Sequence, residues 1–322
     1  MAGAGGEAAA LPQPARPGSP AAPVTPPVIR PAFAKVNLFL DTLEKRPDGY
    51  HTLKTLFERI DLADEVALRP IPGSQIRCRC SDPALPADRS NLAVRAAEGY
   101  QALLGKPLGV EITLTKRIPM AAGLGGGSSD AAAVLAGLQE MTGGGVDPKA
   151  LLDLARTLGA DVPFFLADVP FAWGEGRGDK IAPADFSVRL RHLLVQPDFP
   201  IPTAAVYRGH VLTPFHPDAR LLSEAVKTGR VERIRPHLYN ALEPSVERLF
   251  PAVAGVKRAL EEAGLKRPMV SGSGSTVFAL CDGREPAAGA MERLSKQHPT
   301  WRVWTSQTSG SIPSKPGGRG AA

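Results

Sequence analysis

Apolar residues recur at strand or helix spacing along most of the chain between residues 28 and 308. From Phe33 to Leu40 every second residue is apolar, while Lys35 and Asn37 face the other way, which is typical of a strand. The same criteria predict strands at 110–115, 192–196, 269–270, 277–281 and 301–304, and helices at 91–104, 129–141, 148–158, 218–227, 251–262 and 286–297.

The order of these elements indicates the fold class. Strands and helices are interleaved, but tight strand–helix–strand repeats are absent, which favours an α+β protein over a doubly wound parallel sheet. We expect two domains, 28–185 and 186–308. The segments 1–27 and 309–322 are rich in small residues and proline and poor in core-forming residues, so we expect both to be disordered.

Composition restricts the class of protein. Of 322 residues, 43% are hydrophobic and 22% are charged, as in ordinary globular domains. The longest purely apolar run is about Ala131–Ala136, far short of the roughly 20 residues that span a bilayer, so we expect no membrane segment. Cys78, Cys80 and Cys281 lack the spacing of a disulfide framework or a zinc site, and we expect reduced thiols in a cytoplasmic protein.

The net charge of +6 suits an enzyme that handles anionic small molecules, and it would suit weak nucleic-acid binding equally well. However, the chain has no run of five or more lysines and arginines, and no basic stripe interleaved with aromatic residues. We therefore expect no nucleic-acid partner.

A glycine-rich segment carries the strongest chemical signal. Residues 119–133 read Pro-Met-Ala-Ala-Gly-Leu-Gly-Gly-Gly-Ser-Ser-Asp-Ala-Ala-Ala and lead into the predicted helix, with Ser128, Ser129 and Asp130 as good N-cap residues. Glycines let the backbone approach an anion, and a helix start offers unpaired N–H groups, so the segment is typical of a phosphate-binding loop. It lacks the lysine of a Walker loop. A flexible linker is the alternative, and the apolar helix that follows argues against it.

Two other glycine clusters are ambiguous from the residues alone. Residues 271–276, Ser-Gly-Ser-Gly-Ser-Thr, lie between two predicted strands and suit either a ligand loop or an ordinary hairpin. The cluster Gly174–Gly178 is weaker still and suits a surface turn.

Three segments resemble the three signature motifs of the GHMP kinases, such as homoserine kinase and mevalonate kinase, and occur in the same order. They are residues 31–38, the glycine-rich segment and residues 271–276. Within that superfamily the chain resembles the 4-diphosphocytidyl-2-C-methyl-D-erythritol kinases over about residues 28–306. The strings that carry the closer resemblance are Ala34-Lys-Val-Asn-Leu-Phe-Leu40, Arg46-Pro-Asp-Gly-Tyr-His-Thr-Leu53, Gly125-Gly-Gly-Ser-Ser-Asp-Ala131, Gly159-Ala-Asp-Val-Pro-Phe164 and Tyr239-Asn-Ala-Leu-Glu-Pro244.

The resemblance implies a fold and an activity. The fold is an N-terminal domain like ribosomal protein S5 domain 2 followed by a ferredoxin-like C-terminal domain. The activity is phosphorylation of the 2-hydroxyl of 4-diphosphocytidyl-2-C-methyl-D-erythritol by ATP with Mg²⁺, giving the 2-phosphate and ADP, in the non-mevalonate route to isopentenyl diphosphate. The expected partner is this small molecule, and the expected state is a monomer or weak homodimer.

The resemblance also implies that Asp161 pairs with Lys35 and acts as the base for the substrate hydroxyl, or orients it. A neighbouring ammonium would favour the ionised carboxylate and offset charge on the transferring phosphoryl group. Taken alone, Lys35 could be a solvated strand lysine, and Asp161 could simply cap the helix that Pro163 begins.

The remaining expected contacts also follow from the family motifs. Tyr50 and His51 match a Gly-Tyr-His string that recognises cytidine, and Tyr207 falls where relatives carry an aromatic residue, commonly phenylalanine, on the other side of the base. Other expected substrate contacts are Asn37, Thr203, Ser271, Gly272, Ser273 and Gly274. Expected ATP contacts are Met120, Ala121, Ala122, Gly123, Leu124, Gly125, Gly126, Gly127, Ser128 and Ser129, and no side chain is expected to ligate a metal.

Two other functions compete with this hypothesis. The first is another GHMP small-molecule kinase, against which the Gly-Tyr-His string and the triple glycine argue. The second is a protein with the GHMP fold that binds a ligand without catalysis. Lys35, Asn37 and Asp161 argue against the second, because a pure binder has no need of the Lys–Asp pair.

Overall fold

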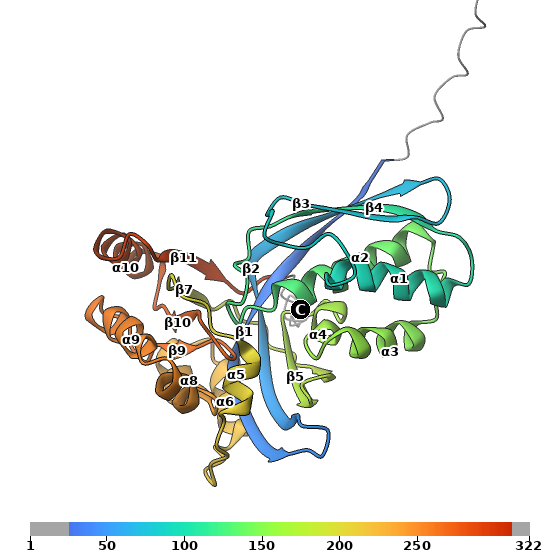
Figure 1. Cartoon of the computed structure of the whole chain (residues 1–322). Coiled ribbons are helices and arrows are strands. Elements are labelled where there is room, and N and C mark those ends of the chain that lie inside the picture. The colour runs from blue at the N-terminus through green and yellow to red at the C-terminus, as the bar shows by residue number, and fades with distance from the viewer. Residues whose placement is uncertain (1–25, 311–322) are drawn as a thin grey trace, which may run out of the picture.

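The computed structural model describes residues 26–310 and contains two β-sheets with helices packed around them (Figure 1). The segments expected to be disordered, 1–27 and 309–322, lie outside the described residues except for two residues each. No helix among residues 26–310 is long and apolar enough to cross a membrane.

The first sheet is built on the long antiparallel pair β1 and β2, which runs through the middle of the molecule (Figure 1). The strand order is β3-β4-β2-β1-β8, and β5 pairs with β2 and with β6. The strands are β1 (Val28–Lys45), β2 (His51–Ile71), β3 (Ile76–Cys80), β4 (Gly109–Thr115), β5 (Phe171–Gly176), β6 (Lys180–Pro183) and β8 (Tyr239–Asn240).

The second sheet has the order β11-β7-β10-β9 and is antiparallel throughout. One strand of the first sheet comes from this later part of the chain: β8 pairs in parallel with β1 at Phe39 and Leu40. The strands of the second sheet are β7 (Arg191–Gln196), β9 (Met269–Val270), β10 (Val277–Leu280) and β11 (Arg302–Gln307).

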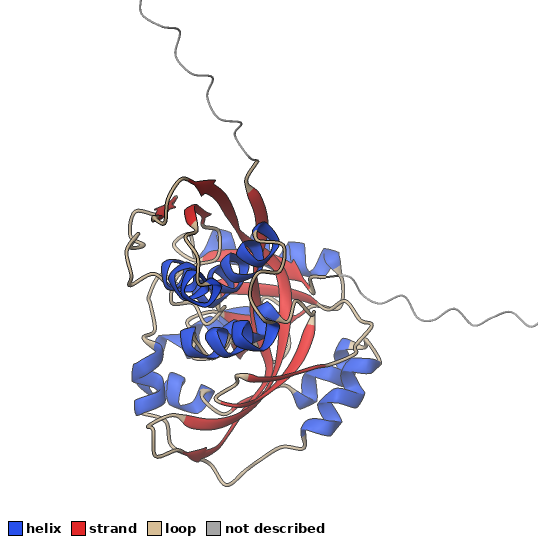
Figure 2. Ribbon diagram, turned by 90° about the vertical axis from the view of Figure 1, so that its right-hand side faces the viewer, coloured by secondary structure: helices blue, strands red, loops and turns tan. Residues whose placement is uncertain are grey.

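Helices gather in groups around the central strands (Figures 1 and 2). Helices α1 to α4 pack with the first sheet around one apolar cluster, and α9 and α10 pack with the second sheet around another. The helices are α1 (Leu92–Leu104), α2 (Gly126–Met141), α3 (Pro148–Leu158), α4 (Val162–Leu166), α5 (Thr203–Arg208), α6 (Ala219–Lys227), α7 (Val231–Ile234), η1 (Arg235–His237), α8 (Glu243–Leu249), α9 (Ala252–Glu262) and α10 (Arg284–Gln297).

A third apolar cluster joins the two sheets. It includes Leu38 and Ile60 from the first sheet and Leu194 and Phe278 from the second, all fully buried. Burial of this kind stabilises by about 25 cal/mol per Å² of apolar surface, so this shared core contributes to holding the two sheets together. This third cluster packs against the apolar face of β1.

Candidate active site

A cavity of about 1100 Å³ opens beside β1 and the start of α2. Segments far apart in the sequence line it: the turn after β1, the residues before α4, the β5–β6 turn, α5 and the loop 271–276. The cavity therefore brings the glycine-rich segment together with most of the residues expected from the sequence to contact substrate.

Lys35 lies at the base of this cavity. Its side chain is 6% exposed, and its Nζ donates hydrogen bonds to Asn37 Oδ1 at 2.7 Å and to the Gly123 carbonyl oxygen at 2.9 Å. Asp161 Oδ2 lies 3.7 Å from the same nitrogen. Burial lowers the pKa of Lys35, and the charge of Asp161 opposes this shift in part.

A short hydrogen-bond chain fixes Asn37. Its Nδ2 donates to Thr55 Oγ1 at 2.8 Å, and the Thr55 hydroxyl donates to the Phe39 carbonyl oxygen at 2.6 Å. The amide oxygen is thereby turned toward Lys35, since the nitrogen side is already engaged. Lys35 and Asn37 share one face of β1, as the alternation of the sequence predicts.

Asp161 immediately precedes α4 at the N-cap position, but its carboxylate makes no capping hydrogen bond. The side chain is 30% exposed and lines the cavity. The simpler interpretation of Asp161 as a side-chain helix cap is therefore wrong, and its carboxylate is paired with Lys35 at the cavity instead.

The glycine-rich segment starts its helix earlier than the sequence pattern predicts. Helix α2 begins at Gly126, and Gly125 is the N-cap with φ of 73°, a left-handed conformation that glycine adopts without strain. The prediction that a residue from Ser128 to Asp130 caps the helix is wrong, because the glycine turn closes three residues sooner. The first N–H groups of α2 have no partner within the helix and lie at the cavity wall.

The residues expected to bind ATP divide into two groups. One group lines the cavity: Ala121, Gly123, Gly125, Gly126, Gly127 and Ser128. The other group lies away from it: Ala122 and Leu124 are buried in the core between the sheets, Met120 is exposed and borders a different groove, and Ser129 is buried in α2 beside another small cavity.

The loop 271–276 is a hairpin connection between β9 and β10 that packs against the glycine-rich segment. Ser271 Oγ donates to the Gly123 carbonyl oxygen at 3.0 Å, and Thr276 N donates to the Ala122 carbonyl oxygen at 3.2 Å. Gly272 and Ser273 line the cavity, while Ser271 and Gly274 are buried behind them and do not. The hairpin interpretation is therefore confirmed, and a ligand contact at Gly272 and Ser273 stays a prediction.

His51 and Tyr207 line the cavity, and His210 packs beside His51. His51 lies 5.9 Å from the Tyr207 ring and 5.3 Å from the His210 ring, centre to centre. Tyr50 also lines the cavity and is 55% exposed. Thr203 Oγ1 lies 2.9 Å from Ser273 Oγ and joins α5 to the hairpin loop.

The electrostatics around His51 favour a neutral imidazole. Burial lowers the pKa of His51, and the charge of Lys45 adds to the effect. The His51 Nδ1 atom is buried without a hydrogen-bond partner among the described residues. Burial also raises the pKa of Tyr207, so its hydroxyl stays a donor.

Several cavity residues were not expected from the sequence. The turn Gly176–Asp179 borders the cavity through Arg177 and Gly178, although the residues alone suggest a surface turn. Thr55 and Phe57 come from β2, which no simple alternation predicts. Others are Leu40, Lys45, Asp48, Gly49, Leu53, Leu92, Ala160, Ala204 and Arg208. Among residues 26–310, no group of three or more His, Cys, Asp or Glu side chains is arranged to hold a metal.

Comparison with known proteins agrees with this geometry. The GHMP kinases N terminal domain model matches residues 91–172, and the GHMP kinases C terminal model matches residues 222–300. The chain is 42% identical over 267 residues to 4-diphosphocytidyl-2-C-methyl-D-erythritol kinase of Geobacter sp. (strain M21), covering 82% of this chain and 93% of the relative. The chain belongs to the 4-diphosphocytidyl-2-C-methyl-D-erythritol kinase family.

Other members of this kinase family are similarly close. The kinase of Salinibacter ruber is 38% identical over 275 residues, which are 83% of this chain and 95% of the relative. A crystal structure of 4-(cytidine 5'-diphospho)-2C-methyl-D-erythritol kinase is 40% identical, with a TM-score of 0.76 over 88% of this chain and all of the other. The family resemblance and the α+β GHMP kinase fold are thus confirmed, and the chain is an ATP-dependent small-molecule kinase.

More distant kinases share the fold alone. Homoserine kinase from Cytophaga hutchinsonii is 21% identical with a TM-score of 0.61 over 86% of this chain and 93% of the other. At such identity, likeness shows a common architecture and leaves the substrate to the residues of the site.

Proposed function

We propose that this kinase transfers the γ-phosphoryl group of ATP to the 2-hydroxyl of 4-diphosphocytidyl-2-C-methyl-D-erythritol in the non-mevalonate route to isopentenyl diphosphate. One observation carries the proposal: a single cavity joins the Lys35–Asp161 pair and the glycine-rich start of α2 to a group of aromatic and imidazole side chains. Relatives about 40% identical over nearly their whole length bear the name of this activity.

In the proposed reaction, Asp161 accepts the proton of the 2-hydroxyl as its oxygen attacks the γ-phosphorus of ATP, and ADP leaves. The Lys35 ammonium lies beside Asp161 and offsets negative charge on the transferring group. Phosphoryl transfer has a loose transition state in most analyses, so positioning and charge stabilisation supply most of the rate. The hydrogen bonds that hold Lys35 to Asn37 and Gly123 serve that positioning.

The phosphates of ATP are expected at the N-terminus of α2. The backbone N–H groups of Gly126, Gly127 and Ser128 are the unpaired donors of the first turn, and the helix dipole favours an anion there. We propose that Mg²⁺ would bind together with the nucleotide, mainly through phosphate oxygens and water, at the part of the cavity wall that includes Ser128. When bound, Mg²⁺ would supply positive charge to offset that of the phosphates.

The cytidine ring is proposed to lie among Tyr50, His51 and Tyr207. A neutral His51 can offer a ring nitrogen to the edge of the base, and the two tyrosine rings offer faces for stacking. Stacking of a base on an aromatic ring contributes about 1–3 kcal/mol in single-strand binding proteins. The methylerythritol end then extends past Gly272 and Ser273 toward Asp161.

A coupled assay of ADP release tests the proposal. Purified protein receives Mg·ATP with 4-diphosphocytidyl-2-C-methyl-D-erythritol, mevalonate, homoserine or galactose in separate reactions. We expect turnover with the cytidyl substrate alone, and a fall in kcat of at least about 100-fold in Asp161→Asn, because the amide cannot accept the proton. Asp153→Asn, on the exposed surface of α3, is the matched control and keeps full activity.

Two outcomes would overturn parts of this proposal. Turnover with another alcohol would mean a related GHMP kinase and would remove the cytidine subsite. ATP binding by a folded protein without turnover of any alcohol would mean a ligand-binding protein. Three further proposals accompany the function: a domain boundary near residue 185, a cytoplasmic location, and a monomer or weak homodimer.

A further inference from the structure

We propose that Arg177 is a specificity-determining positioning residue, which acts on the cytidine end of the substrate by holding the ring of Tyr50 as a wall of the cavity. The inference rests on the proposed function, since it assumes that this end of the cavity takes a pyrimidine nucleoside diphosphate. The Arg177 guanidinium carbon lies over the Tyr50 ring, 5.4 Å from its centre. Both residues line the same cavity.

Tyr50 needs such support because it is exposed. It ends the connection between β1 and β2, where Arg46 and Asp48 form an ion pair and Asp48 Oδ1 accepts a hydrogen bond from Tyr50 N at 3.1 Å. A second bond, from Arg46 N to the Tyr50 carbonyl oxygen at 2.8 Å, closes the turn. These contacts fix the backbone of Tyr50 and leave the side-chain torsions to be fixed by whatever packs on the ring.

Arg177 is itself held rigidly. It lies between Gly176 and Gly178, whose φ values are 71° and 94°, so the β5–β6 turn suits glycine at both places. Asp179 accepts hydrogen bonds from the Arg177 backbone N–H at 3.1 Å and from Nη2 at 3.0 Å. Nη2 also donates to the Arg156 carbonyl oxygen at 3.0 Å, which ties the turn to α3.

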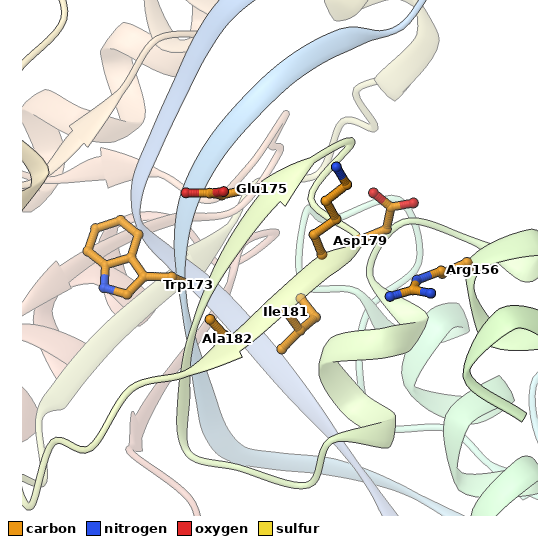
Figure 3. Close-up of a pocket in the computed structure, with 7 residues that line it drawn as sticks. Arg156, Trp173, Glu175, Asp179, Ile181 and Ala182 are labelled. Atoms are coloured by element: carbon orange, nitrogen blue, oxygen red, sulfur yellow. The ribbon is translucent and has the colours of Figure 1, made fainter. Parts of the chain in front are cut away.

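The pKa of Asp179 shows that its interaction with Arg177 is favourable. Burial alone would raise the pKa of Asp179, but hydrogen bonds from Arg177 outweigh it and lower the pKa. In Figure 3, Asp179 lies at the tip of the β5–β6 hairpin on the side of Arg156, and Trp173 and Glu175 point the other way. Arg177 is thus pre-organised before any ligand arrives, and only 28% of its side chain is exposed.

A fixed cation over one part of the ring limits the orientations of Tyr50. The same electrostatic attraction that holds the guanidinium to the ring stabilises one stacked arrangement. A Tyr50 ring that is already held in place loses less conformational entropy when the base binds. Arg177 should therefore affect affinity for the cytidyl substrate more than the rate of phosphoryl transfer. The hydrogen bonds of Arg177 go to Asp179 and to the Arg156 carbonyl oxygen, and its ring contact goes to Tyr50.

The test is a double-mutant cycle with Arg177→Ala, Tyr50→Ala and both together, measured by KM, kcat and calorimetric binding of cytidine 5′-diphosphate. We expect Arg177→Ala to raise KM for the cytidyl substrate and Kd for cytidine 5′-diphosphate about 3- to 10-fold. The kcat and the KM for ATP should stay within about twofold of wild type. In the Tyr50→Ala background, Arg177→Ala should add no further loss.

Two further variants separate positioning from general structure. Arg177→Lys keeps a cation near the ring and should recover part of the lost affinity. Lys54→Ala removes a cation 5.7 Å from the centre of the Trp173 ring, a matched contact on the neighbouring strands that does not line the cavity, and should leave both constants unchanged. Thermal unfolding of each variant checks that the fold is retained.

The outcomes distinguish this inference from the proposed function. If wild type turns over the cytidyl substrate and Arg177→Ala behaves like Lys54→Ala, the inference fails and the function stands. If the two substitutions are fully additive, Arg177 acts on the diphosphate directly and the inference fails. If wild type neither turns over the cytidyl substrate nor binds cytidine 5′-diphosphate, the proposed function fails first.

Discussion

At the residue scale, Gly123 is the point where two glycine loops meet. Its carbonyl oxygen accepts hydrogen bonds from Lys35 Nζ and Ser271 Oγ, so one atom joins Lys35 to the hairpin loop. Its φ is +74°, and a Cβ there would lie 2.1 Å from the Ser271 carbonyl oxygen. The atoms nearest to this Cβ belong to the backbone, so no side-chain movement can make room for it.

Gly123→Ala should therefore lower the free energy of unfolding by about 2 kcal/mol or more, because it combines left-handed strain with a backbone clash. Gly127→Ala is the comparison in the same segment. Its Cβ would have no neighbour nearer than 3.8 Å, and it lies in the first turn of α2. There the change should be neutral or stabilise by up to about 1 kcal/mol. Urea denaturation measures both, and equal effects would contradict the argument.

At the element scale, helices with strong periodicity could be predicted from the sequence. Helix α3 has the predicted bounds, 148–158, since Asp147 caps it and Pro148 opens it. Strand β2 could not be predicted, because Glu58, Arg59 and Asp64 interrupt its apolar pattern. Their partners come from remote parts of the chain, which local spacing does not reveal.

The same limit applies to the site. Family motifs predict Lys35, Asp161 and most of the glycine-rich segment at the cavity, and the alternation of β1 predicts that Lys35 and Asn37 share a face. Thr55 and Arg177 escape prediction, because a threonine in a strand and an arginine in a turn are ordinary until the fold brings them to the cavity.

Helix α2 carries a buried carboxylate whose charge is costly. Asp130 Oδ2 lies 2.5 Å from Lys116 Nζ, which also donates to Asp64 Oδ2, and Asp130 Oδ1 has no hydrogen-bond partner among the described residues. Burial, opposed by Lys116 and assisted by Asp64, raises the pKa of Asp130 from 3.8 to about 7. Cys78 is a further titratable neighbour.

This shift makes stability depend on pH. A carboxyl whose folded-state pKa is raised stabilises the fold fully below its unfolded pKa, and the contribution is lost as pH rises to about 7. Between pH 4.5 and 8, wild type should lose roughly 2–4 kcal/mol relative to Asp130→Asn. Urea denaturation across this range measures the difference. Asp153→Asn should leave the pH dependence unchanged there, since nearby cations lower the pKa of Asp153. Parallel curves for wild type and Asp130→Asn would rule the effect out.

At the scale of the whole molecule, a buried polar cluster ties the two sheets together. Glu58 of β2 is fully buried, with Oε2 lying 3.0 Å from His192 Nε2 of β7 and Oε1 accepting a hydrogen bond from the Thr308 hydroxyl. The cluster lies within the junction between the sheets, so it sets their relative position as well as their attraction.

Glu58→Ala should cost about 2–5 kcal/mol, because it leaves His192 and Thr308 buried without their acceptor. Glu58→Gln keeps the shape and one acceptor oxygen and should cost clearly less. Calorimetric unfolding distinguishes the two. A single transition is expected throughout, and a loss below about 0.5 kcal/mol in the alanine variant would refute the role of the cluster.

The pairing of β8 with β1 has a consequence for biosynthesis. Tyr239 is 200 residues beyond its partner Phe39, and Ala241 N donates to the Leu40 carbonyl oxygen at 2.8 Å. A ribosome therefore releases the first long strand well before the segment that pairs with its edge at Phe39 and Leu40. Until that segment emerges, the nascent chain exposes an unpaired strand edge of the kind that recruits other chains. The rate of translation between Phe39 and Tyr239 therefore sets how long this strand edge is exposed to aggregation.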